Sequence, residues 1–198
     1  MGMIYSESMS HTAADDPPRH RYTVADYHRM GAAGILPPDA RVELIDGEIL
    51  DMPPIGFRHS GTVDKLTRML VTTCGEQAIV RVQGSIQLGE YSEPQPDLTL
   101  LRPRADFFTT GPAAPDDVWL VIEVAATSQR YDRVIKLPLY ARHGIPEVWL
   151  IDLETGQLGR HRRPQSGRYT LADQPPLDNP LAIESLPGLI FTLPALFA

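Results

Sequence analysis

The chain of 198 residues has a single cysteine, Cys74, and no apolar run that approaches the about 18 residues of a membrane-spanning helix. One cysteine cannot form an internal disulfide, so nothing in the sequence indicates an oxidising compartment. The first twenty residues also lack the basic start and the apolar core of a secretory signal. We therefore expect a cytoplasmic protein that does not cross a membrane.

Lysine is also scarce, because the chain has sixteen arginines but only two lysines, Lys65 and Lys136. The formal net charge is −7, and nucleic-acid binding requires clustered basic side chains. The local basic candidates are residues 160–164 (RHRRP), Arg102 and Arg104. The acidic balance therefore counts against a nucleic-acid enzyme unless positive charge gathers at its site.

Several common catalytic motifs are missing. The sequence contains no Walker loop, no G-x-S-x-G elbow, no Cys/His zinc spacing and no Rossmann fingerprint. Cys74 falls at a predicted helix end with no evident histidine partner. These absences disfavour P-loop, serine-hydrolase, zinc, dinucleotide and cysteine chemistry.

The pattern of the remaining chain predicts one α/β domain over residues 21–198, preceded by a flexible polar tail over residues 1–20. Asp46-Gly47 between two strand-like runs predicts a β-hairpin, because both turn positions need positive φ. Apolar periodicity predicts a helix over 59–73 that ends at Gly75. A capping box at Thr23 predicts a shorter helix, which the glycines at 31 and 34 would end.

The second half of the chain predicts a mixed sheet. Residues 118–124 and 147–153 read as strands, and the helix expected over 130–143 would join them as a parallel pair, with a bend at Pro138. Other apolar runs predict further strands over 78–88, 98–101, 158–162 and 169–172. The apolar C-terminal segment is expected to pack on the core or on a partner subunit.

Two carboxylates are hard to explain by folding alone. Glu123 interrupts the buried strand WLVIEVA, where an unpaired carboxylate would cost several kcal/mol or stay protonated. Asp97 follows a Gln-Pro turn and opens the strand LTLL. Carboxylates on neighbouring strands could hold Mg²⁺ for phosphodiester hydrolysis, although a paired buried glutamate and a turn aspartate are the alternatives.

Lys136 is the third candidate, because the chain uses arginine almost wherever a positive charge suffices. A lysine ammonium is a compact charge that can orient or deprotonate a water. Asp132 would position this lysine or form a surface pair with it one helical turn away. Glu43 in the hairpin and His59 at a helix start form a second tier of candidates, and both could equally be ordinary surface residues.

The segments VELIDGEI, PQPDLTLL, WLVIEVA and YARHGIPEVWLID, together with Asp132 and Lys136, closely resemble the Uma-type family of restriction-endonuclease-like proteins. The resemblance runs from Tyr22 to the C-terminus and implies the PD-(D/E)xK nuclease superfamily, with a restriction-endonuclease-like fold in which helices flank a central mixed sheet.

The resemblance also implies roles for individual residues. Pro96-Asp97 resembles the PD element and Glu123 the acidic residue of the second half-motif, while Ala125 stands where the superfamily has lysine. Lys136 from the following helix would replace that lysine. The implied ligands of Mg²⁺ or Mn²⁺ are Asp97, Glu123 and the backbone carbonyl of Val124.

The leading hypothesis is thus a metal-dependent endonuclease acting on DNA, expected to be a homodimer because both strands of a duplex must be cut. One alternative is a non-catalytic dimerising or regulatory module of the same fold. Another is a metal hydrolase that acts on RNA or a nucleotide.

Overall fold

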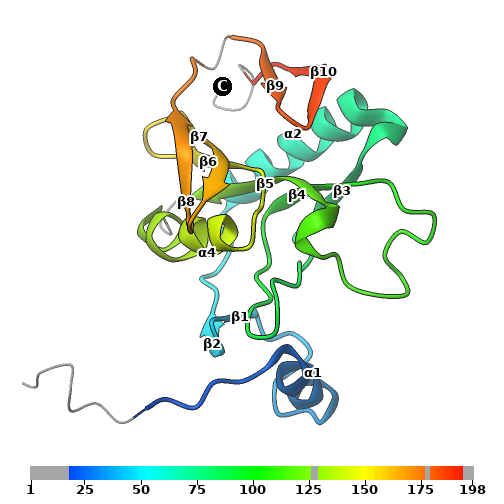
Figure 1. Ribbon diagram of the computed structural model, residues 1–198, viewed down its shortest axis with the longest axis vertical. Coiled ribbons are helices and arrows are strands. Elements are labelled where there is room, and N and C mark those ends of the chain that lie inside the picture. Colours follow the sequence, from blue (N-terminus) through cyan, green and yellow to red (C-terminus); the bar gives the residue numbers. More distant parts are fainter. Residues whose placement is uncertain (1–17, 126–128, 177–178, 194–198) are drawn as a thin grey trace, which may run out of the picture.

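The computed structural model describes residues 18–125, 129–176 and 179–193, and its centre is a six-stranded sheet (Figure 1). The strand order is β3-β4-β5-β6-β7-β8, in which β5 and β6 are parallel and the other neighbouring pairs are antiparallel. The strands are β3 (Ile79–Val82), β4 (Leu98–Leu101), β5 (Val118–Ala125), β6 (Glu147–Asp152), β7 (Gln157–Gln165) and β8 (Arg168–Asp173). This mixed sheet confirms the predicted fold class.

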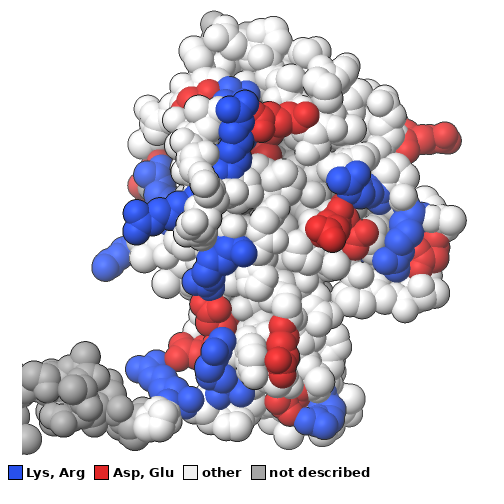
Figure 2. Space-filling view, in the orientation of Figure 1, with Lys and Arg blue, Asp and Glu red and all other residues white. Residues whose placement is uncertain are grey.

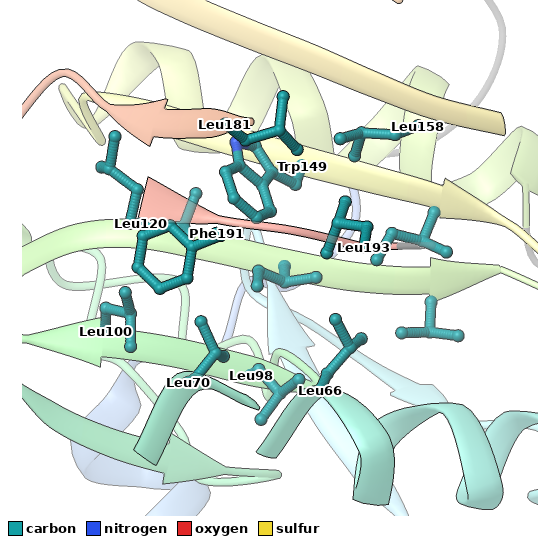
Figure 3. Packing of buried hydrophobic residues seen from close by; sticks show 14 of the residues in the cluster. Leu66, Leu70, Leu98, Leu100, Leu120, Trp149, Leu158, Leu181, Phe191 and Leu193 are labelled. Atoms are coloured by element: carbon teal, nitrogen blue, oxygen red, sulfur yellow. The ribbon is translucent and has the colours of Figure 1, made fainter. Parts of the chain in front are cut away.

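One face of the sheet is covered by α2 (Phe57–Cys74) and by the hairpin of β9 (Leu181–Ile183) and β10 (Leu186–Phe191). Figure 3 shows Leu66 and Leu70 of α2 packed with strand residues of this face. Trp149 and Phe191 meet edge to face, with ring centroids 6.0 Å apart. The described part of the C-terminal segment therefore packs on the core of its own chain.

The other face of the sheet carries the helical segment that joins β5 to β6. In β5, Leu120, Ile122 and Val124 face α2, whereas Val121 belongs to the opposite core cluster. Because side chains alternate along a strand, Glu123 points to the same face as Val121. The strand thus places one carboxylate beneath the connecting helices.

That connecting segment comprises α3 (Gln129–Tyr131), the π-helical turn η3 (Asp132–Lys136) and α4 (Leu137–Arg142). The sequence predicts a kink at Pro138, which has no N–H to donate to the carbonyl of Val134. In the structure the turn before Pro138 is widened, and the Leu137 N–H donates to the carbonyl of Asp132. Such π turns are frequent at functional sites.

A smaller lobe at the bottom of Figure 1 contains α1 (Val24–Ala32) and the antiparallel hairpin of β1 (Val42–Ile45) and β2 (Glu48–Asp51). The predicted turn is present, with φ of 50° at Asp46 and 85° at Gly47. A Cβ at Gly47 would lie 2.6 Å from the Cβ of Arg21. Both the positive φ and this close approach therefore require glycine here. Thr23 and Asp26 form the predicted capping box.

Three sequence predictions need correction. The strand expected over 78–88 ends at Val82, because Gln83 has a φ of 46° and the chain leaves the sheet there. Gly31 lies inside α1 and does not end it, since the helix continues to Ala32. Helix α2 begins at Phe57, two residues before the predicted start. Most of the predicted tail, residues 1–17, lies outside the described residues.

Among the described residues, no helix is both long and apolar enough to span a bilayer. The remaining short helical turns are η1 (Gly75–Gln77) and η2 (Pro115–Asp117), which lead into β3 and β5.

Candidate active site

Every candidate residue predicted from the sequence lines one pocket of about 480 Å³. The pocket lies where the hairpin lobe, the start of α2, the β4–β5 pair and the helical connection meet. Its lining includes Glu43, His59, Asp97, Glu123, Val124, Asp132 and Lys136. The structure therefore brings together residues that the sequence places on five separate segments.

Asp97 directly precedes β4, and Glu123 lies on the neighbouring antiparallel strand β5. Leu98 of β4 pairs with Ile122 of β5, so the next pair in the same register is Asp97 with Glu123. The carboxylate of Asp97 also accepts a hydrogen bond from the backbone N–H of Val124, at 2.9 Å from Oδ2. Sheet register alone thus places both carboxylates on the same face.

Lys136 is buried between two carboxylates. Its Nζ lies 3.2 Å from Oε2 of Glu43 and 3.3 Å from Oε1 of Glu123. The lysine is 5 % exposed and Asp132 is 4 % exposed, which excludes a surface ion pair as the role of Lys136. The widened turn η3 carries both residues into the pocket.

Two tyrosines that the sequence analysis did not select complete the site. The Tyr140 hydroxyl donates to Oε1 of Glu123 at 2.6 Å, and the Tyr131 hydroxyl donates to Oε1 of Glu43 at 3.0 Å. The backbone N–H of Gln95 donates to the other oxygen of Glu43 at 3.1 Å. In the sequence, Tyr140 stands four residues after Lys136, about one helical turn, and this spacing could have identified it as a site residue.

His59 contacts Asp97 from the first turn of α2. Its Nε2 lies 3.0 Å from Oδ2 of Asp97, and both side chains are 14 % exposed. The Nδ1 atom of His59 is buried and has no hydrogen-bond partner among the described residues. Oδ2 of Asp97 is therefore held by two groups, the imidazole and the Val124 N–H.

Burial dominates the electrostatics of the site. It raises the pKa of Glu123 to about 8, against the lowering effect of Lys136 and with a further increase from Asp132 and Asp97. Burial also lowers the pKa of Lys136, but Glu123, Glu43 and Asp132 outweigh it and hold that pKa above its ordinary value. At neutral pH the lysine is charged, and Glu123 retains affinity for a proton or another cation.

The donor chemistry suits a hard divalent cation, which prefers carboxylate and carbonyl oxygens. Neither Oδ1 of Asp97 nor Oε2 of Glu123 receives a hydrogen bond from a described residue. No group of three or more His, Cys, Asp or Glu side chains within the described ranges could hold a metal ion alone. A ligand set here would need the backbone carbonyl and water besides the two carboxylates.

Part of the pocket lining is apolar. Leu50 lies on β2, and Met52, Pro53, Pro54 and Ile55 belong to the segment that joins the hairpin to α2. The pocket therefore combines charged and apolar lining residues.

Eight of the sixteen arginines, none of them in the pocket lining, form ion pairs with Asp or Glu. Figure 2 shows Lys and Arg side chains intermixed with Asp and Glu on the face that it draws. In the RHRRP segment, Arg160 pairs with Asp173, and Arg162 pairs with both Asp173 and Glu184. These arginines thus have structural partners.

The fold that carries this pocket resembles that of a solved nuclease-like structure. Over 88 % of this chain and 97 % of the other, the structure matches a crystal structure described as "a putative nuclease belonging to DUF820 from Anabaena variabilis ATCC 29413". The TM-score is 0.67 and the sequence identity is 20 %, so the two chains share a fold.

Residues 24–194 match the Uma2 family, described as "Putative restriction endonuclease". The chain belongs to this family, as the sequence resemblance predicts. No curated protein matches the sequence.

Proposed function

We propose that the chain is a metal-dependent endonuclease that hydrolyses DNA phosphodiester bonds in this pocket, with Mg²⁺ or Mn²⁺ bound by Asp97, Glu123 and the backbone carbonyl of Val124. The supporting observation is the convergence of two carboxylates, one on β5 and one just before β4, with a buried lysine in one pocket of a nuclease-like fold. A structural ion pair would not require a pocket or the second carboxylate.

The bound cation would neutralise charge on the scissile phosphate and activate a water molecule. The protein groups then have separate tasks. Lys136 stays protonated because its pKa is raised, so it acts as a hydrogen-bond donor and a fixed positive charge and not as a base. Its two carboxylate contacts hold the ammonium group in place within the pocket.

Glu43 and His59, the second tier of candidates, position Lys136 and Asp97. Glu43, itself held by Tyr131 and the Gln95 N–H, fixes Lys136 from the side of the hairpin lobe. His59 fixes Asp97 so that Oδ1 remains for the metal. Outer partners of this kind typically contribute about 10- to 100-fold in metal affinity or activity.

The test is cleavage of single-stranded DNA, duplex DNA and RNA by the full chain, with and without Mg²⁺ or Mn²⁺. We expect cleavage of DNA that depends on the metal and is lost in Asp97→Ala. Absence of metal-stimulated cleavage on every DNA form, together with unchanged Mn²⁺ binding in Asp97→Ala, would contradict the proposal.

The alternative is a non-catalytic module, possible on the same fold, and the net charge of −7 with paired surface arginines favours it. Thermal stabilisation by Mn²⁺ separates the two functions. A catalytic metal site predicts a shift in the wild type that Glu123→Ala lacks, whereas equal shifts support the module. A homodimer and a cytoplasmic location stay predictions.

A further inference from the structure

One exposed arginine stands beside the candidate active site without a carboxylate partner. Arg58 lies in the first turn of α2, between Gly56 and His59, which both line the pocket. Among the described residues its side chain forms no ion pair, and its one hydrogen bond runs from Nη2 to the carbonyl of Leu153, at 2.8 Å. A guanidinium has five N–H donors, so most of them remain for a ligand.

The hydrogen bond to Leu153 fixes the position of this charge. Leu153 follows β6, and its N–H donates to the carbonyl of Ala125 at the end of β5. Arg58 therefore lies at the carboxyl ends of the parallel pair β5–β6, the end at which Glu123 and Val124 stand. With about 3.3 Å per residue and about 4.8 Å between strands, Leu153 lies about 8 Å from Val124. The guanidinium is thus close to the proposed metal position but outside the pocket lining.

The pocket is acidic, so a phosphate can enter it only together with a cation. Its lining has five carboxylates against two permanent cations, namely Glu43, Asp51, Asp97, Glu123 and Asp132 against Arg41 and Lys136. A divalent cation would offset this charge for the scissile phosphate, as the proposed function requires. The phosphates that flank it lie farther from the cation, so they gain most from a basic group outside the lining.

The edge of the sheet around Arg58 is close to neutral. Asp152, at the end of β6, accepts two backbone hydrogen bonds through Oδ1, and its Oδ2 lies 4.0 Å from Arg133. Glu154, in the turn after β6, is exposed, and within the described residues no ion pair joins it to Arg58. Two arginines thus face two carboxylates here, whereas in the pocket five carboxylates face two cations. A phosphate meets less repulsion at this edge than in the pocket.

The neighbourhood decides which anion Arg58 would bind, because a guanidinium accepts a phosphate or a carboxylate through the same pair of N–H groups. A DNA strand held at Asp97 and Glu123 carries its next phosphates on the same chain, one for each about 3.4 Å of axial rise. Such a tethered phosphate has a high effective concentration at a distance of about 8 Å. A carboxylate from a second copy would instead need an interface of its own, of about 1,000 Å² or more. The substrate backbone is therefore the favoured partner.

Resting on the proposed function, we infer that Arg58 is a substrate-binding residue that contacts a backbone phosphate of the DNA next to the scissile one. The contact holds the strand across the carboxyl ends of β5 and β6 while the metal acts on the scissile phosphate. It fixes the position of the strand and reads no base sequence.

DNA binding at several salt concentrations tests this contact without cleavage. The probe is a fluorescein-labelled duplex, measured by anisotropy with the full chain and with Ca²⁺, which prefers the same oxygen ligands, in place of Mg²⁺. We expect Arg58→Ala to weaken binding by about 10-fold or more at low salt. The slope of log K against log salt concentration should fall in magnitude by about 0.9, the value for one lost phosphate contact.

Two further variants serve as controls. Arg58→Lys keeps the charge without the planar fork, so it should restore the salt slope and part of the affinity. Arg68→Ala should bind like the wild type. Arg68 is exposed on the same helix, forms no ion pair with a described residue and lies outside the pocket lining, about 15 Å further along α2.

Three outcomes would overturn the assignment: a salt slope unchanged in Arg58→Ala, an equal loss of affinity in Arg68→Ala, or no DNA binding by the wild type. A dimer that Arg58→Ala converts to a monomer in sedimentation equilibrium would overturn it too, because the bound anion would then belong to a partner subunit. If urea unfolding shows that Arg58→Ala does not fold, Arg58→Gln takes its place. A slope lower by about 0.9 in Arg58→Gln than in Arg58→Lys supports the contact, and equal slopes exclude it.

The outcome for Arg58 is independent of the outcome for the proposed function. Metal-stimulated cleavage and Mn²⁺ binding can be present whatever the salt slope of Arg58→Ala, and the slope can be measured if cleavage is absent. Failure of the phosphate contact is thus distinguishable from failure of the nuclease activity.

Discussion

Nζ of Lys136 lies 3.3 Å from Oε1 of Glu123, and the two side chains are 6 % and 4 % exposed. A buried pair of this kind contributes little net stability compared with apolar side chains, but loss of one partner leaves the other charge without compensation. The pair therefore indicates a requirement of the site more than a requirement of the fold.

Lys136→Met is expected to lower the free energy of unfolding by about 3–5 kcal/mol at alkaline pH, because Glu43 and Glu123 then repel each other without a cation. The loss should shrink near neutral pH, where Glu123 can take up a proton. Urea unfolding measures it. Lys65→Met, at the only other lysine and on the exposed side of α2, is the control and should change stability by no more than the about 1 kcal/mol of an exposed ion pair.

Asp97→Asn is expected to abolish metal binding while the fold survives. The amide oxygen can still accept from the Val124 N–H, so stability should change by no more than about 1 kcal/mol. Mn²⁺ affinity, measured by titration calorimetry, should fall by more than the about 10- to 100-fold typical of an outer partner. Asp64→Asn, on the exposed side of α2, should bind Mn²⁺ like the wild type. Equal affinities in all three proteins would exclude Asp97 as a ligand.

The pH dependence of the free energy of unfolding should reflect the titration of Glu123. Its pKa is raised in the folded protein from 4.5 to about 8, so the folded state binds a proton more tightly than the unfolded state between these values. Stability of the chelator-treated protein should therefore be greatest at the acidic end of this window, fall as pH rises to about 8, and level off beyond it.

Glu123→Gln should make that decline shallower without removing it, because burial also raises the pKa of Glu147 and gives it the same sign of dependence. Urea unfolding at about pH 5 and about pH 9 in the presence of a chelator is the measurement. Identical slopes in the two proteins would show that Glu123 does not titrate in this range.

The role of His59 in holding Asp97 can be tested by replacing the Nε2 donor. Glutamine can donate from a position similar to Nε2, whereas alanine cannot. We expect Mn²⁺ affinity to fall by about 10- to 100-fold in His59→Ala and to recover in large part in His59→Gln. Calorimetry on the uncleaved, DNA-free protein gives this value independently of catalysis. If glutamine fails as badly as alanine, the imidazole acts by some means other than holding Asp97.

The sequence predicts those parts of the fold and site that depend on local rules. Asp46-Gly47 encodes its turn through backbone conformation, and Glu123 stands out because a carboxylate in an apolar strand needs a partner. Asp97 is marked by the proline before it and by the strand after it. The sequence allows Asp97 and Glu123 to lie side by side in a sheet, but only the observed register of β4 and β5 pairs them.

What the sequence does not reveal depends on the tertiary structure. Tyr131 and Tyr140 look like ordinary helix residues until the fold sets their hydroxyls against Glu43 and Glu123. The widened turn before Pro138 is likewise invisible, because a proline signals a disturbance without specifying how the backbone absorbs it.

The hydrogen bond between Tyr131 and Glu43 joins positions 88 residues apart in the chain. Closing so long a segment costs entropy that only nearly complete packing can offset, so the pocket is absent from a partly synthesised or partly folded chain. Under the proposed function, a nascent chain that ends before the helical connection lacks Lys136 and Tyr131 and is inactive, so cleavage activity begins only after that segment has been synthesised and has folded onto the sheet.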